Sequence, residues 1–189
     1  MLEKIPSAVG EALSGLKAGM EKTAFHADFP DIPASITVSS PAFADRSAMP
    51  VRFTADGEGL SPPLTWSGLP VGTASVVLLV EDAGSPTPQP LVHLIAWNLP
   101  PDLAQISEGA VSDPGPGKTL PLGKNSFLRA GWLPPDPPSG HGPHEYVFQI
   151  YALRQTLDLS DEPGRGALLK AMDGHVLSKG MLIGTYARA

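Results

Sequence analysis

Two histidines in a loop rich in proline and glycine are the most evident candidates for chemistry. The segment from Pro134 to Tyr146 reads PPDPPSGHGPHEY and carries His141 and His144 just before a strand-like run. Proline fixes the backbone angle φ and glycine permits angles that other residues resist, so covalent geometry sets the shape of this loop. Rigid loops that hold polar side chains at the end of a strand are common positions for binding or catalysis. The alternative is a proline-rich turn whose histidines are only hydrogen-bonded structural groups.

Polar residues also interrupt two apolar runs elsewhere in the chain. The run SVVLLV ends in Glu81 and Asp82, and His93 lies inside the apolar run LVHLIAW. Taken alone, a carboxylate at a strand end is typical of a solvated boundary residue or a turn cap, and a lone histidine in an apolar strand is typical of the core. Yet Asp82 and His93 flank the same connection, and His144 precedes the next strong strand. If these strands are neighbours, one carboxylate and two imidazoles meet at a single rim.

Three kinds of chemistry fit one carboxylate and two imidazoles. They can form a facial metal site, although no HxH or HxxxH spacing supports one. A histidine–aspartate pair can act as a general base for hydrolysis, with Ser85 or Ser126 as the nucleophile, but neither serine lies in a GxSxG turn. Imidazole donors and the N–H groups of a glycine loop can also bind an anion, while the carboxylate orients a histidine or receives a ligand's ammonium group. The spacing does not rank these three.

The composition narrows the class of protein. The 189 residues are 42% hydrophobic and 17% charged, as in a globular protein with a substantial core. The net charge of −6, without a block of basic residues, argues against binding nucleic acid or an anionic membrane by bulk electrostatics. The absence of cysteine excludes disulfides and thiolate metal ligands. The N-terminus does not resemble a secretory signal and no apolar run is long enough to span a membrane, so we expect a cytoplasmic protein.

Short apolar runs between turns predict a predominantly β domain. The 22 prolines and 20 glycines are spread between these runs and punctuate them. We expect strands or extended segments at residues 35–39, 51–54, 64–66, 74–81, 91–98, 146–153 and 181–186. One short helix is expected over residues 166–172. The pattern predicts a β-sandwich of the β-rich α+β class with few short helices.

The N-terminal residues predict an additional amphipathic helix over residues 5–20. The apolar residues that recur there at helical spacing are Ile5, Val9, Leu13, Leu16 and Met20. The segment FHADFPDIP separates this helix from the strands, so we divide the chain into residues 1–30, the helix and linker, and residues 31–189, the main domain. The apolar side of the helix needs a cover, which the domain itself or a homodimer can supply.

Four blocks of the sequence resemble the phosphatidylethanolamine-binding proteins, in particular their bacterial branch, often labelled Raf-kinase-inhibitor-like. These blocks are LSPPLTWSGLP at 60–70, VLLVEDAGSPTPQPLVHLIAWNLP at 77–100, GKNSF at 123–127 and PPDPPSGHGPHEYVFQIYAL at 134–153. The segment HVLSKGMLIGTY near the C-terminus is similar to that branch as well, so the resemblance spans roughly residues 35–188. The DxxxP…H and GHGPHxY blocks in this order are highly specific.

The resemblance implies a β-rich fold with a small pocket that binds phosphate-like anions, such as a phosphatidylethanolamine head group, without a cofactor, a metal or turnover. Carried over by position, the ligand-binding residues are Asp82, Pro86, His93, Pro137, Pro138, His144 and Tyr146. The two histidines would donate hydrogen bonds to the anion, and Asp82 would hold a histidine or a ligand amine. A regulatory inhibitor that binds a kinase or a protease through its surface is the second hypothesis. A hydrolase that uses the histidine–aspartate pocket is the third.

Two residues depart from the usual pattern of the family. The family motif at the strand end is usually DPDAP, whereas here the stretch from Asp82 to Pro86 reads DAGSP, so Gly84 replaces the second aspartate. Asp136 stands where relatives often carry a small residue or cysteine. A carboxylate at the pocket mouth opposes an anion unless it is paired or faces away. Next to it, His141 is expected to hold the loop, while His144 is expected to line the pocket.

Overall fold

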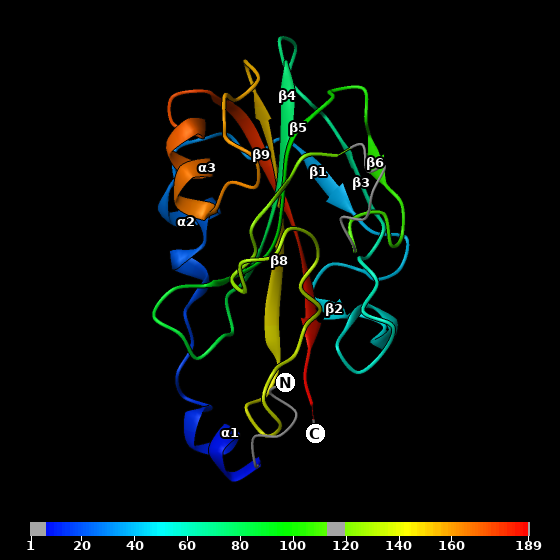
Figure 1. Cartoon of the computed structure of the whole chain (residues 1–189), viewed down its shortest axis with the longest axis vertical. Helices are drawn as coiled ribbons and strands as arrows, with labels where there is room; N and C mark the ends of the chain where they lie inside the picture. The colour runs from blue at the N-terminus through cyan, green and yellow to red at the C-terminus, as the bar shows by residue number, and fades with distance from the viewer. Residues whose placement is uncertain (1–6, 113–119, 189) are drawn as a thin grey trace.

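The computed structural model describes residues 7–112 and 120–188, which form two β-sheets that share a hydrophobic core (Figure 1). The larger sheet contains, in spatial order, β2 (Ser47–Ala48), β9 (Val176–Tyr186), β8 (His144–Leu153), β4 (Ser75–Asp82), β5 (Leu91–Leu99) and β7 (Leu122–Gly123). The smaller sheet contains β1 (Thr37–Ser39), β3 (Leu64–Ser67) and β6 (Gln105–Ile106). Neighbouring strands are antiparallel except β2 and β9. This architecture confirms the predicted β-rich sandwich.

Both faces of the larger sheet are covered. On one face, Trp66 of the smaller sheet belongs to the same core as Leu78 and Phe148 of the larger one. On the other face, Leu79 and its neighbours pack with residues of two helices, among them Leu168. Every residue of β4 is therefore buried. Burial on both faces explains why SVVLLV is continuously apolar and does not alternate.

The helical segments are short. They are α1 (Ser7–Leu13), α2 (Ala24–Ala27), α3 (Arg165–Met172) and the 3-10 helices η2 (Met20–Lys22) and η3 (Val51–Phe53). Helix α3 confirms the helix expected at residues 166–172. No helix of the described residues is long and apolar enough to cross a membrane.

The N-terminal helix is shorter than predicted. It ends at Leu13, and the next residue, Ser14, turns its hydroxyl back onto the carbonyl of Glu11 at 2.7 Å. Because serine competes for backbone hydrogen bonds and glycine at position 15 is a poor helix former, the helix does not continue to residue 20. Leu16 then lies in irregular chain with its side chain 57% exposed. Ile5, the first apolar residue of the predicted helix, lies outside the described residues.

The strand predicted at residues 51–54 is wrong, because these residues form the 3-10 helix η3. Pro50 precedes it with φ of −53°, and the hydroxyl of Thr54 closes the turn on the carbonyl of Val51 at 2.9 Å. Phe53 is fully buried and supplies the apolar contact that the sequence suggested for a strand. A turn thus buries one side chain where the apolar pattern favoured an extended segment.

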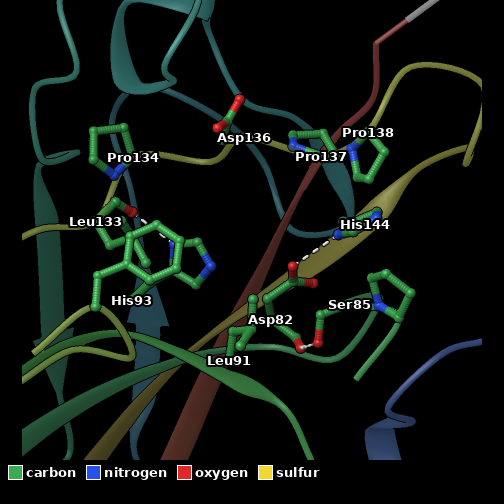
Figure 2. Close-up of a pocket in the computed structure, with 12 residues that line it drawn as sticks. Asp82, Ser85, Leu91, His93, Leu133, Pro134, Asp136, Pro137, Pro138 and His144 are labelled. Carbon is green, nitrogen blue, oxygen red and sulfur yellow. Dashed lines mark hydrogen bonds and ion pairs between the residues drawn. The ribbon is translucent and has the colours of Figure 1, made fainter. Parts of the chain in front are cut away.

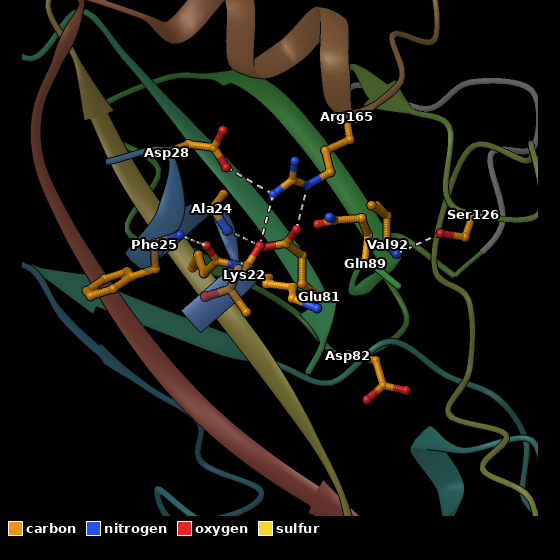
Figure 3. A network of polar contacts seen from close by, with 12 residues as sticks. Lys22, Ala24, Phe25, Asp28, Glu81, Asp82, Gln89, Val92, Ser126 and Arg165 are labelled. Carbon is orange, nitrogen blue, oxygen red and sulfur yellow. Dashed lines mark hydrogen bonds and ion pairs between the residues drawn. The ribbon is translucent and has the colours of Figure 1, made fainter. Parts of the chain in front are cut away.

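A buried carboxylate fixes α2 to the larger sheet (Figure 3). Glu81 is fully buried, and it accepts hydrogen bonds from the N–H of Ala24 at 2.7 Å, from Nε2 of Gln149 at 2.8 Å and from Nε of Arg165 at 2.7 Å. Arg165 also contacts Asp28 at 3.0 Å. Since buried polar groups are tolerated when they are hydrogen-bonded, Glu81 is a structural anchor. The expectation of a solvated carboxylate at this strand end is wrong for Glu81.

The register of the larger sheet brings the end of β4 next to the starts of β5 and β8. Asp82, the last residue of β4, is opposite Leu91 on one side and Tyr146 on the other. His93 follows two residues after Leu91, and His144 is the first residue of β8. One carboxylate and two imidazoles therefore meet at a single rim, as the order of apolar runs predicted.

Candidate functional site

A small cavity opens at this rim of the larger sheet (Figure 2). Its volume is about 40 Å³. Six of the seven residues predicted for the pocket line it: Asp82, Pro86, His93, Pro137, Pro138 and His144. The other lining residues are Ser85, Leu91, Phe127, Leu133, Pro134 and Asp136. Most of the wall is therefore apolar, and the few polar atoms decide what the cavity can bind.

Tyr146 is the predicted pocket residue that does not line the cavity. Its ring lies behind the two histidines, with centroid distances of 5.0 Å to His93 and 6.3 Å to His144. Its hydroxyl is buried without a hydrogen-bond partner among the described residues. Burial raises the pKa of Tyr146 well above its ordinary value, and the nearby Asp82 and Asp136 carboxylates add to this effect. Tyr146 thus supports the histidine rings from the side of the core.

Asp82 and His144 form a buried pair. Nδ1 of His144 lies 2.7 Å from Oδ2 of Asp82, and the two side chains are 2% and 4% exposed. The other carboxylate oxygen accepts the N–H of Gly84 at 2.8 Å. Nε2 of His144 lies 2.8 Å from Nδ1 of His141. Because both ring nitrogens of His144 have protein partners, this histidine has no free donor for an anion, and that part of the sequence interpretation is not supported.

His93 presents a hydrogen-bond acceptor to the cavity. Its Nδ1 lies 2.6 Å from the carbonyl oxygen of Leu133, which can only accept, so the hydrogen is on Nδ1. Burial lowers the pKa of His93, against the opposing effect of Asp82, so the ring is neutral near pH 7. Its Nε2 therefore carries a lone pair, and this atom is buried without a partner among the described residues. Figure 2 shows this nitrogen facing the space beside Asp82 and His144. At this atom His93 can therefore accept a hydrogen bond from a ligand but cannot donate one, contrary to the role that the sequence suggested.

Asp136 also lines the cavity, across from Asp82 (Figure 2). Its carboxylate is paired with the guanidinium of Arg188, whose side chain is 9% exposed. Arg188 also donates to both carboxylate oxygens of Asp56, each at 2.7 Å, and these hydrogen bonds raise the pKa of Arg188. Asp136 is therefore not an isolated carboxylate at the cavity, although it shares the single positive charge of Arg188 with Asp56. Arg188 follows the last strand and belongs to no motif, and the sequence analysis did not find it.

Gly84 stands where the family motif usually has a second aspartate, and the structure leaves no room for a side chain there. A Cβ atom at this position would lie 2.6 Å from Cα of His144, so no side chain fits between the loop and the start of β8. The N–H of Gly84 donates to Asp82, which fixes the loop to the site. The loop keeps its anchor although the usual carboxylate is missing.

The two serines that a hydrolase could use are not next to a histidine. The hydroxyl of Ser85 donates to the carbonyl of Asp82 at 3.0 Å and contacts the hydroxyl of Thr87 at 2.8 Å. The hydroxyl of Ser126 accepts the N–H of Val92 at 2.7 Å. A nucleophilic serine requires a base within hydrogen-bond distance, and the described residues provide none at either position. Within residues 7–112 and 120–188, no group of three or more histidine and acidic side chains is arranged to hold a metal ion.

The chain matches one protein family over most of its length. The family model described as phosphatidylethanolamine-binding protein matches residues 39–187. A UPF0098 protein of Pyrococcus horikoshii is 40% identical over 156 residues, which cover 82% of this chain and 77% of that protein. A UPF0098 protein of Methanothermobacter thermautotrophicus is 40% identical over 151 residues, which cover 78% of this chain and 95% of that protein.

Solved structures agree with this match. The crystal structure of a putative phosphatidylethanolamine-binding protein homologue from Chlamydia trachomatis superposes with a TM-score of 0.73 at 32% identity, covering 82% of this chain and 99% of that one. YbcL of E. coli, described as a member of the mammalian family, superposes with a TM-score of 0.74 at 27% identity, covering 82% and 100%. The chain belongs to the phosphatidylethanolamine-binding protein family.

Proposed function

We propose that the cavity binds the phosphate group of a small phosphorylated ligand, such as phosphoethanolamine or the head group of phosphatidylethanolamine, and releases it unchanged. Family membership supports ligand binding of this general kind. The observation that carries the proposal is Nε2 of His93, a buried acceptor without a partner among the described residues, which faces the cavity. A buried polar atom without a partner costs roughly 1–3 kcal/mol, so a ligand that supplies a hydrogen there gains affinity.

The polar lining selects the protonation state of the ligand. Asp82, Asp136 and Nε2 of His93 are all acceptors, and each of the two carboxylates has a protein partner, His144 for Asp82 and Arg188 for Asp136. A fully ionised phosphate only accepts hydrogen bonds and fits this lining poorly. A singly protonated phosphate monoester brings one O–H for His93 and a single negative charge. The ammonium group of an ethanolamine ligand brings further donors toward the carboxylates.

Calorimetry at pH 6 with phosphoethanolamine tests the proposal. We expect saturable binding to the wild-type protein and no binding to His144→Ala, because that change removes the side chain that lies 2.7 Å from Asp82 and leaves this carboxylate without it at the cavity. His26→Ala is the matched control, since His26 is exposed on α2 and distant from the cavity in the fold. Absence of binding to the wild type, or equal affinity of the His144→Ala variant, contradicts the proposed site.

Two further ligands identify the source of the phosphate. Inorganic phosphate tests the phosphate group alone, and vesicles containing phosphatidylethanolamine test the lipid head group. Binding of phosphoethanolamine and phosphate without vesicle binding assigns the site to free phosphate compounds. Vesicle binding that His144→Ala abolishes assigns it to the lipid.

A further inference from the structure

A row of hydrogen-bond contacts leads from the cavity to the N-terminal segment, residues 7–19. Oδ2 of Asp82 lies 2.7 Å from Nδ1 of His144, and Nε2 of His144 lies 2.8 Å from Nδ1 of His141. Nε2 of His141 in turn lies 3.1 Å from the carbonyl oxygen of Leu16. As whole residues, Asp82, His141 and His144 are each no more than 3% exposed. Water therefore does not compete for these contacts, and the protein atoms alone must supply the hydrogens.

Counting hydrogens fixes the protonation of this set. Each of the three contacts needs one hydrogen. The carbonyl of Leu16 and an ionised Asp82 can only accept, and two neutral imidazoles carry two hydrogens in total. All three contacts therefore form only when the set of Asp82, His141 and His144 holds one further proton, on an imidazole or on the carboxyl group. In that state the net charge of the set is zero.

Loss of this proton breaks one particular contact. The bond from His144 to the Asp82 carboxylate is the shortest of the three and is charge-assisted, so it keeps its hydrogen on Nδ1 of His144. The contact between the two imidazoles then takes its hydrogen from Nδ1 of His141. A lone pair remains on Nε2 of His141 and faces the carbonyl of Leu16. The contact to the N-terminal segment is the one that is lost.

The N-terminal segment lies against both loops that form the cavity. The N–H of Ala18 donates to the carbonyl of Ser85 at 2.7 Å, in the loop after β4. Helix α1 lies beside the loop that leads into β8 (Figure 1). A Cβ atom at Gly10 of α1 would lie 1.9 Å from the carbonyl oxygen of Ser139, so the helix touches this loop where only glycine fits. The segment precedes the part of the chain that the family model matches, residues 39–187.

We propose that His141 is a positioning residue that couples the protonation of the site to docking of the N-terminal segment. The segment is held when the set of Asp82, His141 and His144 carries its extra proton, and it loosens when that proton leaves. Because coupling is reciprocal, a docked segment also helps to keep the extra proton on the set of Asp82, His141 and His144. This step rests on the proposed function: the set with its extra proton is the form that binds a negatively charged ligand.

Other ionisable groups near the set do not account for the proposed pH dependence of docking of the N-terminal segment. They are His93, Tyr146, Asp136, Arg188, and Glu11 and Lys17 of the N-terminal segment. Burial lowers the pKa of His93 and raises that of Tyr146, so neither of these two groups gains charge between pH 6.5 and 8.5. Asp136 and Arg188 are paired with each other, and Glu11 and Lys17 are exposed to solvent.

Hydrogen exchange of the ligand-free protein tests the coupling. After correction for intrinsic exchange rates, we expect the protection of residues 14–18 to fall about tenfold between pH 6 and pH 8.5, since one hydrogen bond is lost when the set gives up its extra proton. In His141→Phe, protection should be low and independent of pH, with the cooperative unfolding of the domain retained. Protection that does not change with pH in the wild type overturns the proposal. An unchanged pH dependence in His141→Phe does so as well.

A second variant acts from the other side of the contact. Gly10→Ala forces α1 away from Ser139, so protection of residues 14–18 should be low already at pH 6. Gly166→Ala is the matched control, because no atom of the described residues would lie within 4 Å of a Cβ at that exposed position of α3, so protection of residues 14–18 should equal that of the wild type. Equal protection in the two variants contradicts docking through α1.

Nitrogen-15 NMR of the imidazole rings reads the proton directly. At pH 6 the wild type should show the extra proton on the set, and Gly10→Ala should lose it at a lower pH than Gly166→Ala. Spectra of His141 and His144 that show a neutral set in the wild type at pH 6 refute the hydrogen count. These measurements need no ligand, so a failure of phosphate binding leaves them interpretable and counts only against the proposed function.

Discussion

A ligand without a hydrogen should bind the cavity poorly even when it matches phosphate in size and shape. Sulfate provides this perturbation, because it is a tetrahedral oxyanion that carries no proton near neutral pH. Nε2 of His93 is a buried acceptor, and sulfate would leave it unpaired and place a second acceptor against it. The structure thus predicts that sulfate loses the hydrogen bond that a protonated phosphate forms. A lost hydrogen bond to a charged group is worth roughly 1.5–3 kcal/mol, which corresponds to about 10-fold to 150-fold in affinity.

The affinity for a phosphate monoester should fall as the pH rises. The second pKa of such a monoester is about 6, so about half of it is singly protonated at pH 6 and about 1% at pH 8. If only that form binds, the apparent dissociation constant rises about 50-fold over this interval. Burial lowers the pKa of His93, so protonation of this ring does not cause the part of the change that lies between pH 6.5 and 8. Loss of the proton shared by Asp82, His141 and His144 acts in the same direction.

Calorimetry at constant ionic strength, with phosphoethanolamine and sulfate at pH 6, 7 and 8, measures both effects. The two pH effects have the same sign, so the comparison of ligands at pH 6 is the decisive one. Sulfate that binds at pH 6 as tightly as phosphoethanolamine would falsify the reasoning about His93, as would monoester affinity that is equal at pH 6 and pH 8.

Two further predictions concern stability. Glu81→Gln should lower the free energy of unfolding in urea by about 3 kcal/mol, because it breaks a buried, fully bonded ion pair, whereas Glu108→Gln, in an exposed pair with Arg52, should cost less than about 1 kcal/mol. Equal losses in the two variants would show that burial of Glu81 carries no extra cost. Burial lowers the pKa of His93 below its value in the unfolded chain. The contribution of His93 to the free energy of unfolding is therefore present above about pH 6.5 and is lost as the pH falls, by up to about 1.4 kcal/mol per pH unit. Urea unfolding of His93→Phe should therefore show a weaker decline between pH 6.5 and 5, and an undiminished decline would assign it to other groups.

The main strands could be predicted from the sequence because their residues are buried in a regular pattern. The segments that became β4, β5 and β8 are long, apolar and bounded by proline or glycine, and their order already placed Asp82 beside His93 and His144. The two-residue strands were not predictable in this way, since β2 at Ser47–Ala48 is exposed and gains its partner only when β9 is in place. Short elements of this kind depend on the sheet and not on their own composition.

Part of the site depends on pairings that the sequence does not display. Asp136 was expected to oppose an anion. The effect of its carboxylate depends on the pairing with Arg188, which lies 52 residues away in the chain. Gly84 looked like a lost carboxylate, and the contact with His144 shows that the position has no space for one. In both cases the residue type was read correctly, but its effect depends on a neighbour that only the folded chain brings close.

The histidines show why residue type and position do not suffice to define this site. His93 and His144 are both buried at the same rim, and the sequence assigned them the same role as donors to an anion. The carbonyl of Leu133 takes the hydrogen of His93, so this ring offers an acceptor, whereas Asp82 and His141 occupy both nitrogens of His144. Since a carbonyl oxygen belongs to every residue, no sequence pattern reports which histidine it will meet. The protonation state of a preferred ligand therefore follows from backbone placement, and a search for ligands should vary the protons that a compound carries as well as its charge.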